Sequence, residues 1–442
     1  MGVDFVEHGL RAVERLLPHL ECPKWTEGEW AESKCVWTSA KKTEVRLTVS
    51  IGNSDEVGAR SLTAYIKRRK LPGSGGSARD IIDSREHSIC SLVAARISGV
   101  LEHRVAGADD WASMQAIQAA FDESIVAAHV QKHHDLNLPL ASVLRDLHTL
   151  SEQSYENKAL TFGCILDPGK KGIAGAANFP TDFLESKKYR ALSDGFRTAY
   201  WVSRDGTLAD FVDLDRQGYE ALTEKHYFPE WAEPIARSSR QGRCGIALSR
   251  QGDILIFDEG TLRFTYRYGR WQYWNHAHLV KLLRDRARAQ HVPQRKLGRV
   301  VGSIYRAAID ISFRRSGGLF LILHNRHSRS EVVKSSDTLF NASRSQVDIE
   351  FDSVFEDRAI QSLPRSVTVE LASLDGSVVL ENSGRIVAYG AILQPRRGGK
   401  LRGTEGSRTK AAVGASNYGL AIKISSDGDM SVYFNGEEFI RV

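Results

Sequence analysis

Small, basic and hydroxyl side chains stand next to one another near the C-terminal end of the sequence. They are Gly406, Ser407, Arg408, Thr409 and Lys410, and small residues follow that predict a short helix. Ser407 is an acceptable N-cap for that helix, and the free backbone amides at a helix start attract anions. Two cations beside hydroxyl groups, with a glycine that lets the backbone approach closely, would complete a polyphosphate site. The alternative is a solvated surface segment.

An aspartate before this run could supply a second part of the chemistry. Asp375 precedes Gly376 and Ser377 at the expected start of a strand. A carboxylate there could bind Mg²⁺ or Mn²⁺ and help to deprotonate a hydroxyl nucleophile. Metal, phosphate site and acid together indicate nucleotidyl transfer, although an Asp-Gly pair by itself is more often a turn.

The elements that must position these residues are predicted from the apolar pattern of the last part of the chain. A helix is expected around residues 304–311, and a buried strand over 319–323 follows two glycines. Two hairpins follow, one of residues 374–380 and 386–393, the other of residues 419–424 and 430–434. Because strands and helices alternate, we expect an α/β or α+β fold with a mixed β-sheet flanked by helices.

The order and spacing of these pieces resemble the diadenylate cyclase (DAC) domain, which joins two ATP molecules into cyclic di-AMP. That family has a glycine-rich first strand, an Asp-Gly-Ala motif, a returning strand ending in Ala-Ile-Leu-Pro, a Gly-Thr-Arg-His-Arg-Ala-Ala motif and a final hairpin. This sequence has the corresponding segments at 317–323, 374–377, 384–393, 406–414 and 419–434. The chain therefore resembles a divergent member of the family, or one of its sensor-type relatives.

The resemblance implies roles for individual residues. It assigns metal binding and activation of the attacking 3′-hydroxyl to Asp375, with Mg²⁺ or Mn²⁺ as cofactor. It assigns nucleotide binding to Gly376, Ser377, Gly406, Ser407, Arg408, Thr409 and Lys410. The sequence departs from the family at Leu374 and Thr409, where a His is usual, at Ser377, where Ala is usual, and at Lys410, where Arg is usual. Lysine keeps the charge but loses the planar two-point contact with phosphate, so nucleotide binding would survive these changes better than turnover.

Three functions compete. The first is an ATP-binding, cyclase-like nucleotidyltransferase, which needs two facing sites and therefore a homo-oligomer or an intrachain pseudo-dimer. The second is a catalytically inactive sensor of ATP or a related adenine nucleotide that signals to a partner. The third is a structural or nucleic-acid-binding protein that uses the arginine-rich stretch of residues 281–299. Nucleic acid is the less favoured partner, because the net charge is only +6 over 442 residues.

The chain divides into three expected parts. Residues 1–155 are predicted to be mostly helical with one clear strand over 45–51, residues 156–280 are β-rich, and residues 281–442 form the DAC-like domain. Within the β-rich part, residues 192–195 are similar to 374–376, and 245–257 to 419–433. Two alternatives stay open, a degenerate tandem copy of the DAC-like domain or two unrelated hairpin sheets. The β-rich part has no good equivalent of the Gly-Ser-Arg-x-Lys run at residues 406–410, so a copy of the domain there would not hold a triphosphate in the same way.

Cysteine usage and hydropathy indicate the compartment. The five cysteines are scattered with no Cys-x-x-Cys pair, which favours reduced thiols over a disulfide framework or a zinc site. No apolar run approaches the roughly 18 residues of a membrane span, and we expect a cytoplasmic protein without membrane contact. The pairs His276 with His278 and His324 with His327 could ligate a metal, but no cysteine or acid cluster stands near them at ligand spacing.

Overall fold

The computed structural model describes residues 2–22, 25–29, 31–38, 42–51, 60–69, 81–105, 120–155, 158–176, 178–179, 186, 189, 192–339, 353–355, 358–395 and 406–442. These residues form two compact units. Unit 2 contains Tyr227–Glu230 and Asn275–Val442, and the other described residues form unit 1. Helices and mixed β-sheets occur in both, so the chain has the α+β fold that the sequence predicts. The first two expected parts lie almost entirely in unit 1, and the third lies in unit 2.

The first part of unit 1 contains helix α1 (Gly2–Leu16) and a five-stranded antiparallel sheet. Its strands are β1 (Leu20–Glu21), β2 (Trp25–Glu29), β3 (Lys34–Trp37), β4 (Glu44–Ile51) and β5 (Arg60–Arg68). Their order is β1-β5-β4-β3, and β2 also pairs with β5. The expected strand is β4, and the other four strands correct the prediction of a single one. β1 has only two residues and β2 is largely exposed, so neither shows an apolar alternation in the sequence.

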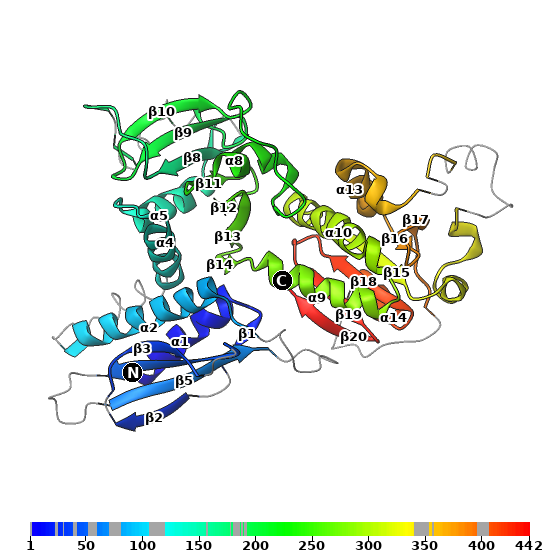
Figure 1. Cartoon of the computed structure of the whole chain (residues 1–442), viewed down its shortest axis with the longest axis horizontal. Coiled ribbons are helices and arrows are strands. Elements are labelled where there is room, and N and C mark those ends of the chain that lie inside the picture. Colours follow the sequence, from blue (N-terminus) through cyan, green and yellow to red (C-terminus); the bar gives the residue numbers. More distant parts are fainter. Residues whose placement is uncertain are drawn as a thin grey trace. The chain divides into compact units, whose positions relative to one another are not determined.

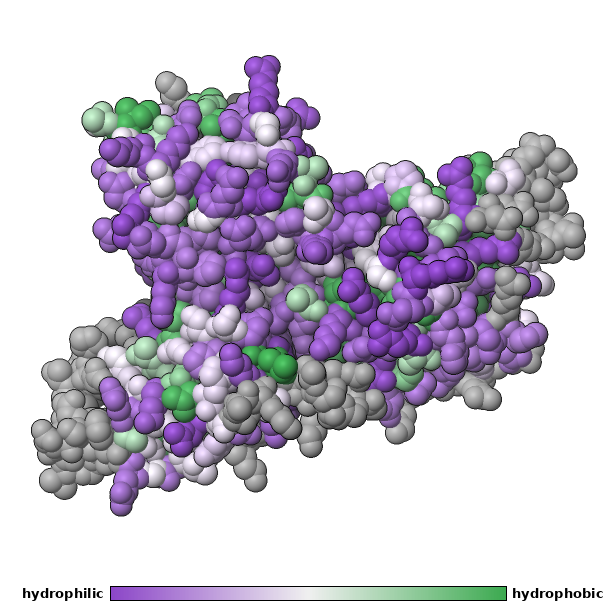
Figure 2. All heavy atoms as spheres, viewed as in Figure 1, coloured by the Kyte–Doolittle hydropathy of each residue, from purple (hydrophilic) through white to green (hydrophobic). Residues whose placement is uncertain are grey.

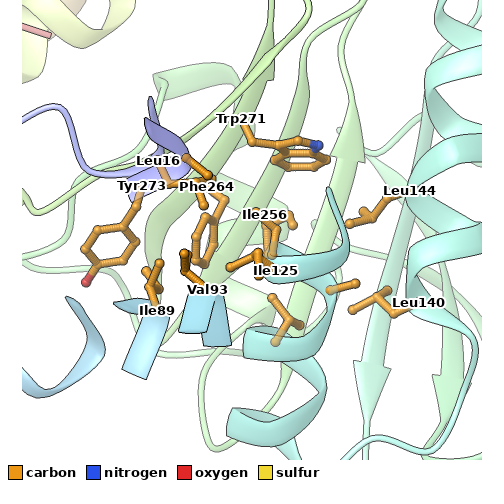
Figure 3. Close-up of a cluster of buried hydrophobic side chains, with 14 of the residues drawn as sticks. Leu16, Ile89, Val93, Ile125, Leu140, Leu144, Ile256, Phe264, Trp271 and Tyr273 are labelled. Carbon is orange, nitrogen blue, oxygen red and sulfur yellow. The ribbon is translucent and has the colours of Figure 1, made fainter. Parts of the chain in front are cut away.

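Three helices of unit 1 follow this sheet, and their apolar faces share one core with strands from later in the chain. The helices are α2 (Ser84–Val105), α4 (Phe121–His134) and α5 (Leu140–Ser151). The shared core includes Leu16, Ile89, Val93, Ile125, Leu140, Leu144, Ile256, Phe264, Trp271 and Tyr273 (Figure 3). These helices lie within residues 1–155, which the sequence predicts to be mostly helical.

The second part of unit 1 is a seven-stranded sheet. After the small pair β6 (Ser154–Tyr155) and β7 (Lys158–Ala159), its strands are β8 (Phe162–Asp167), β9 (Thr198–Ser203), β10 (Leu208–Asp213), β11 (Cys244–Leu248), β12 (Ile254–Asp258), β13 (Thr261–Arg267) and β14 (Arg270–Tyr273). Their order is β10-β9-β8-β11-β12-β13-β14. β8 and β9 run parallel, and all other neighbours are antiparallel. A short 3₁₀ helix, η2 (Glu230–Ala232), and α8 (Glu233–Ser238) precede β11.

Unit 2 is built around a six-stranded sheet in the order β17-β16-β15-β18-β19-β20. The strands are β15 (Gly318–Leu323), β16 (Ser377–Leu380), β17 (Ile386–Ala391), β18 (Gly419–Ile424), β19 (Met430–Phe434) and β20 (Glu437–Arg441). The helices are α9 (His276–Ala289), α10 (Gln294–Arg314), α11 (Arg329–Val332), α13 (Arg365–Ser373) and α14 (Ser407–Ala415), with 3₁₀ turns η3 (Arg326–Ser328), η4 (Ser335–Asp337) and η5 (Ile360–Ser362). The predicted buried strand and both predicted hairpins are present, and β20 adds a third strand to the second hairpin.

Helices cover both faces of the sheet of unit 2 (Figure 1). On one face, Leu319, Leu321 and Leu323 of β15 share a core cluster with Ala412 and other residues of α14. On the opposite face, a side chain at Gly318 would meet residues of α10 and α13. Because successive strand residues point to alternate faces, every odd-numbered residue of β15 faces α14.

Hydrophilic side chains dominate the described surface on the face shown in Figure 2, and hydrophobic ones occur there in small groups. No helix among the described residues is long and apolar enough to cross a membrane.

One acid in the core of unit 1 is poorly satisfied. Glu123 of α4 is 9% exposed, and its Oε1 accepts no hydrogen bond within the described part of the chain. Arg145 Nε lies 3.7 Å from Oε1, beyond hydrogen-bond distance. Burial raises the pKa of Glu123 to about 7, and the nearby Arg145 opposes that rise only in part.

We therefore predict that Glu123→Gln stabilises the protein at pH 8 by about 1 kcal/mol. The folded-state pKa lies above the unfolded value, so the wild type keeps its full stability below pH 4.5 and loses some as the pH rises toward 7. Glutamine does not titrate, and its advantage should appear over that interval. Urea unfolding at pH 4.5 and pH 8 measures it. Exposed Glu32→Gln is the control, and an equal gain at both pH values would contradict the prediction.

Candidate functional site

A cavity of about 670 Å³ opens at one end of the sheet of unit 2. It brings together six of the residues predicted from the sequence, Asp375, Gly376, Gly406, Ser407, Arg408 and Thr409. Its other lining residues are Leu319, Ala391, Ile392, Leu393, Ala411, Lys423, Ser425 and Ser426. Two segments about thirty positions apart in the sequence thus contribute to one cavity, whose volume is in the range of small-molecule sites.

The strand directions explain why these residues meet. β15 and β16 are parallel and begin at the same end of the sheet, so Asp375, just before β16, lies near the start of β15. β18 is antiparallel to β15 and ends there, with Lys423 directly opposite Leu319. Paired residues of an antiparallel ladder share a face, and this is the face that α14 covers. The cavity therefore lies between strand ends and the first turn of α14.

Arg408 is held against the backbone at Gly317. A side chain at Gly317 would overlap a terminal nitrogen of the Arg408 guanidinium, and Gly317 has a φ of +70°, which favours glycine. Within the described residues, no carboxylate pairs with Arg408. The guanidinium therefore lines the cavity with its hydrogen-bond donors available to an anion.

The start of α14 differs by one residue from the prediction. The N-cap is Gly406, with extended backbone at φ −63° and ψ 159°, and Ser407 is the first helical residue. The predicted N-cap role of Ser407 is therefore wrong. No side chain caps the helix, and the Ser407 side chain is exposed at the cavity.

Lys423 is a cavity residue that the sequence did not single out. Its Nζ donates to Thr409 Oγ1 at 2.9 Å, which joins the end of β18 to α14. The available signal was a single cation in an otherwise apolar strand, because β18 is buried except at this position. A cation that interrupts a buried strand generally has a specific partner.

Two predicted residues do not line the cavity. Lys410 is exposed on α14, two helix positions beyond Arg408. Ser377 is 1% exposed, and its Oγ donates to the Ala391 carbonyl at 2.9 Å. Ser377 therefore fastens β16 to β17, in the same sheet that bears Asp375.

Asp375 is exposed at the cavity and is followed by a conformationally restricted glycine. Gly376 has a φ of +123°, and a side chain there would clash with the carbonyl carbon of Gly390. Asp375 is the one acid that lines the cavity, so the described residues offer a metal ion a single carboxylate. Mg²⁺ is commonly bound by one or two carboxylates together with substrate phosphates and water, so this donor set fits a metal that arrives with a nucleotide.

The other metal candidates are engaged in ordinary contacts. His276 Nδ1 lies 2.9 Å from Tyr305 Oη, and His324 Nδ1 donates to the Tyr418 carbonyl at 2.6 Å. One group of three potential ligands occurs in the described parts of the chain, formed by His133, His134 and Asp258. The Arg85 guanidinium already forms an ion pair with that aspartate, whose pKa it holds below the usual range against the effect of burial.

The arginine-rich stretch falls on α9 and α10 and contributes in part to packing. Arg286 is 8% exposed, and its guanidinium lies 4.8 Å from the ring centre of Phe434 and 4.2 Å from that of Phe439. It packs as a cation on aromatic faces. Arg286 therefore belongs to the packing of unit 2, whereas Lys281, Arg284, Arg288, Arg295 and Arg299 of the same stretch are exposed.

No family model and no curated protein matches the chain. A solved structure of a hypothetical membrane spanning protein from Bacillus cereus is similar over 37% of this chain and 74% of its own, at 19% identity and a TM-score of 0.26. A double mutant of DacA from Staphylococcus aureus is similar over 33% of this chain and 90% of its own, at 20% identity and a TM-score of 0.22. Neither similarity is strong enough to carry an argument about this chain.

The glycine after Asp375 gives a testable prediction. Gly376→Ala should destabilise unit 2 by about 2 kcal/mol or more, because it adds both an unfavourable φ and a backbone clash. Urea unfolding of the whole chain measures the effect. Gly218→Ala is the control, since it has open space around it and no positive φ. Equal stability of the two variants would show that the Gly376 backbone is not constrained in this way.

Proposed function

We propose that unit 2 binds ATP or a related adenine nucleotide in this cavity and, with a divalent metal, condenses two ATP molecules to cyclic di-AMP as a diadenylate cyclase-like nucleotidyltransferase. The observation that carries the proposal is the convergence of Asp375 with Ser407, Arg408 and Thr409 on one cavity. They are among the residues to which the resemblance with the DAC family assigns metal binding and nucleotide binding.

The cavity offers a phosphate group two cations. Arg408 and Lys423 both line it, and Ser407 adds a hydroxyl at the first residue of α14. Charge-assisted hydrogen bonds to phosphate are about twice as strong as neutral ones, and the amides of a first helical turn add to them. Lys423 comes from the strand and Arg408 from the helix, so a triphosphate could be held from two sides.

The metal would be held by Asp375 together with phosphate oxygens of the nucleotide. A bound Mg²⁺ or Mn²⁺ lowers the pKa of a coordinated hydroxyl and offsets charge on the phosphates. Asp375 is exposed at the cavity, so its carboxylate is accessible to a metal that enters with ATP.

The reaction requires two nucleotides. The 3′-hydroxyl oxygen of each ATP forms a bond to the α-phosphorus of the other. The bond from that phosphorus to the oxygen that bridges the α- and β-phosphates breaks, and pyrophosphate leaves. The two hydroxyl protons pass to a base or to water, so two ATP give one cyclic di-AMP and two pyrophosphates.

A nucleotide sensor without turnover is the second candidate, and specific observations favour it. Leu374, where the family has His, is 45% exposed and supplies no acid–base group. Thr409, also in place of His, accepts a hydrogen bond from Lys423. Lys410, in place of Arg, lies outside the cavity lining. These departures favour nucleotide binding through Arg408 over turnover.

Incubation of the purified 442-residue chain with ATP and Mg²⁺ or Mn²⁺, with products resolved by chromatography, separates the two candidates. The wild type should form a cyclic dinucleotide, and Asp375→Asn should lower the rate by about 100-fold or more while binding persists. Arg408→Ala should weaken ATP binding by about 10-fold or more, measured by calorimetry. Arg295→Ala removes an exposed charge of α10 outside the cavity lining and is the control.

The outcomes are distinct. No product, with saturable binding that Arg408→Ala weakens, would exclude the cyclase and support the sensor. Neither product nor saturable nucleotide binding by the wild type would contradict both candidates.

A further inference from the structure

We propose that the second part of unit 1 and the sheet of unit 2 are two copies of one structural repeat, and that only the second copy has an open site. Each chain would then bind one nucleotide, so a reaction that joins two nucleotides would need a second copy of this chain. The identity of the ligand rests on the proposed function, whereas the repeat and its closure rest on the fold alone.

The two sheets share strand order and strand direction. We call the second part of unit 1 repeat 1 and the sheet of unit 2, with its helices, repeat 2. In repeat 1, β8 pairs in parallel with β9 and antiparallel with β11, and β10, β12 and β13 extend the sheet on its two sides. In repeat 2, β15 pairs in parallel with β16 and antiparallel with β18, and β17, β19 and β20 extend the sheet on the same two sides. One strand, β14, is added in repeat 1.

The hairpin turns share their hydrogen bonds as well. Two backbone hydrogen bonds close the turn of residues 203–207 and also the turn of residues 381–385. In each turn, the N–H of the first residue donates to the carbonyl of the fifth residue, and the N–H of the fourth residue donates to the carbonyl of the first. The same two bonds close residues 249–253 and residues 425–429. A segment outside each sheet also matches, since Phe179 N–H donates to the Gly206 carbonyl and Ile360 N–H to the Gly384 carbonyl.

A serine after the helix of each repeat makes an identical set of contacts. Ser416 follows α14, and its Oγ and carbonyl accept the N–H groups of Gly436 and Asn435 in the last hairpin turn. Ser239 follows α8, and the same two atoms accept the N–H groups of Gly260 and Glu259. All four turn residues have positive φ. Unrelated sheets have no reason to reproduce this detail, so these contacts favour the tandem copy.

The shared turns give the alignment of the two repeats and correct the one expected from sequence. Asp375 lies six residues before the turn that begins at Glu381, and the equivalent residue before Ser203 is Arg197, not Asp194. Trp231 lies eight residues before Ser239, as Arg408 lies eight residues before Ser416, so Trp231 is the equivalent of Arg408. Gly245 likewise corresponds to Ala421, whereas the sequence comparison paired it with Gly419, two residues earlier. Repeat 1 therefore lacks the acid, and an aromatic residue replaces the arginine.

The chain itself occupies the place of the cavity in repeat 1. Gly163 and Ala247 correspond to Leu319 and Lys423, which line the cavity of repeat 2. A side chain at Gly163 would overlap Gly195, and a side chain at Gly195 would lie 3.3 Å from Ala247 Cβ. The backbone at Gly195 thus covers both positions.

Further bonds hold this covering segment in place. Ser193 Oγ accepts the Gly163 N–H at 2.9 Å. The Asp194 carboxylate accepts three backbone N–H groups, from residues 196 to 198, and these hold its pKa below the usual value although burial opposes ionisation. Trp231 packs edge to face on Phe196 at a ring distance of 4.8 Å. Asp194 is therefore engaged within its own loop.

Titration calorimetry with 3′-deoxyATP and Mg²⁺ tests the number of sites on the whole chain. This nucleotide lacks the attacking hydroxyl and cannot be joined to a second one. We expect one nucleotide per chain, with binding weakened by Arg408→Ala and unchanged by Arg295→Ala. Two nucleotides per chain, or a full-strength site that survives Arg408→Ala, would overturn the proposal.

A second measurement, made without a nucleotide, tests whether the backbone at Gly195 fills the place of the cavity in repeat 1. Gly163→Ala should strongly destabilise unit 1 in urea unfolding, because its side chain would displace Gly195, whereas Gly218→Ala has open space around it and is the control. Equal stability of these variants would overturn the closed repeat. Absence of nucleotide binding together with a destabilised Gly163→Ala would contradict the proposed function and leave the closed repeat in place.

Discussion

The direction of three strands determines where unit 2 can carry a site. β15 runs parallel to β16 on one side and antiparallel to β18 on the other. The starts of β15 and β16 and the end of β18 therefore meet at the same end of the sheet, where Asp375 and Lys423 lie. A slip of β15 by one residue would move Leu319 from the face that lines the cavity to the opposite face.

The helix that completes the site is fixed at both of its ends. At its start, Arg408 packs against the backbone of Gly317, and Thr409 accepts a hydrogen bond from Lys423. After its end, Ser416 binds the turn at Gly436. The cations of the cavity are thus attached to the rigid sheet. A site built on such elements needs little reorganisation when an anion enters.

The sequence predicted the elements whose signal is local. The turns at Gly384 and Gly428, the buried β15 and the helix after Gly406 each follow from short patterns, and Asp375 and Arg408 stand beside them. Lys423 was not predicted, because its place in the cavity depends on the strand opposite it. The two repeats could not be aligned from sequence for the same reason, since the turns and serines that match them are distant in the chain.

Two sheets of one strand order in a single chain could exchange equivalent hairpins while they fold, which is a known failure of tandem repeats. Here the first sheet carries an extra strand, β14, whose Trp271 and Tyr273 belong to the core formed with α1 and α2 (Figure 3). A hairpin from the second sheet would bring no such strand to that core. The core shared by β14 and the N-terminal helices thus distinguishes the first sheet from the second in the folded chain, independently of any ligand.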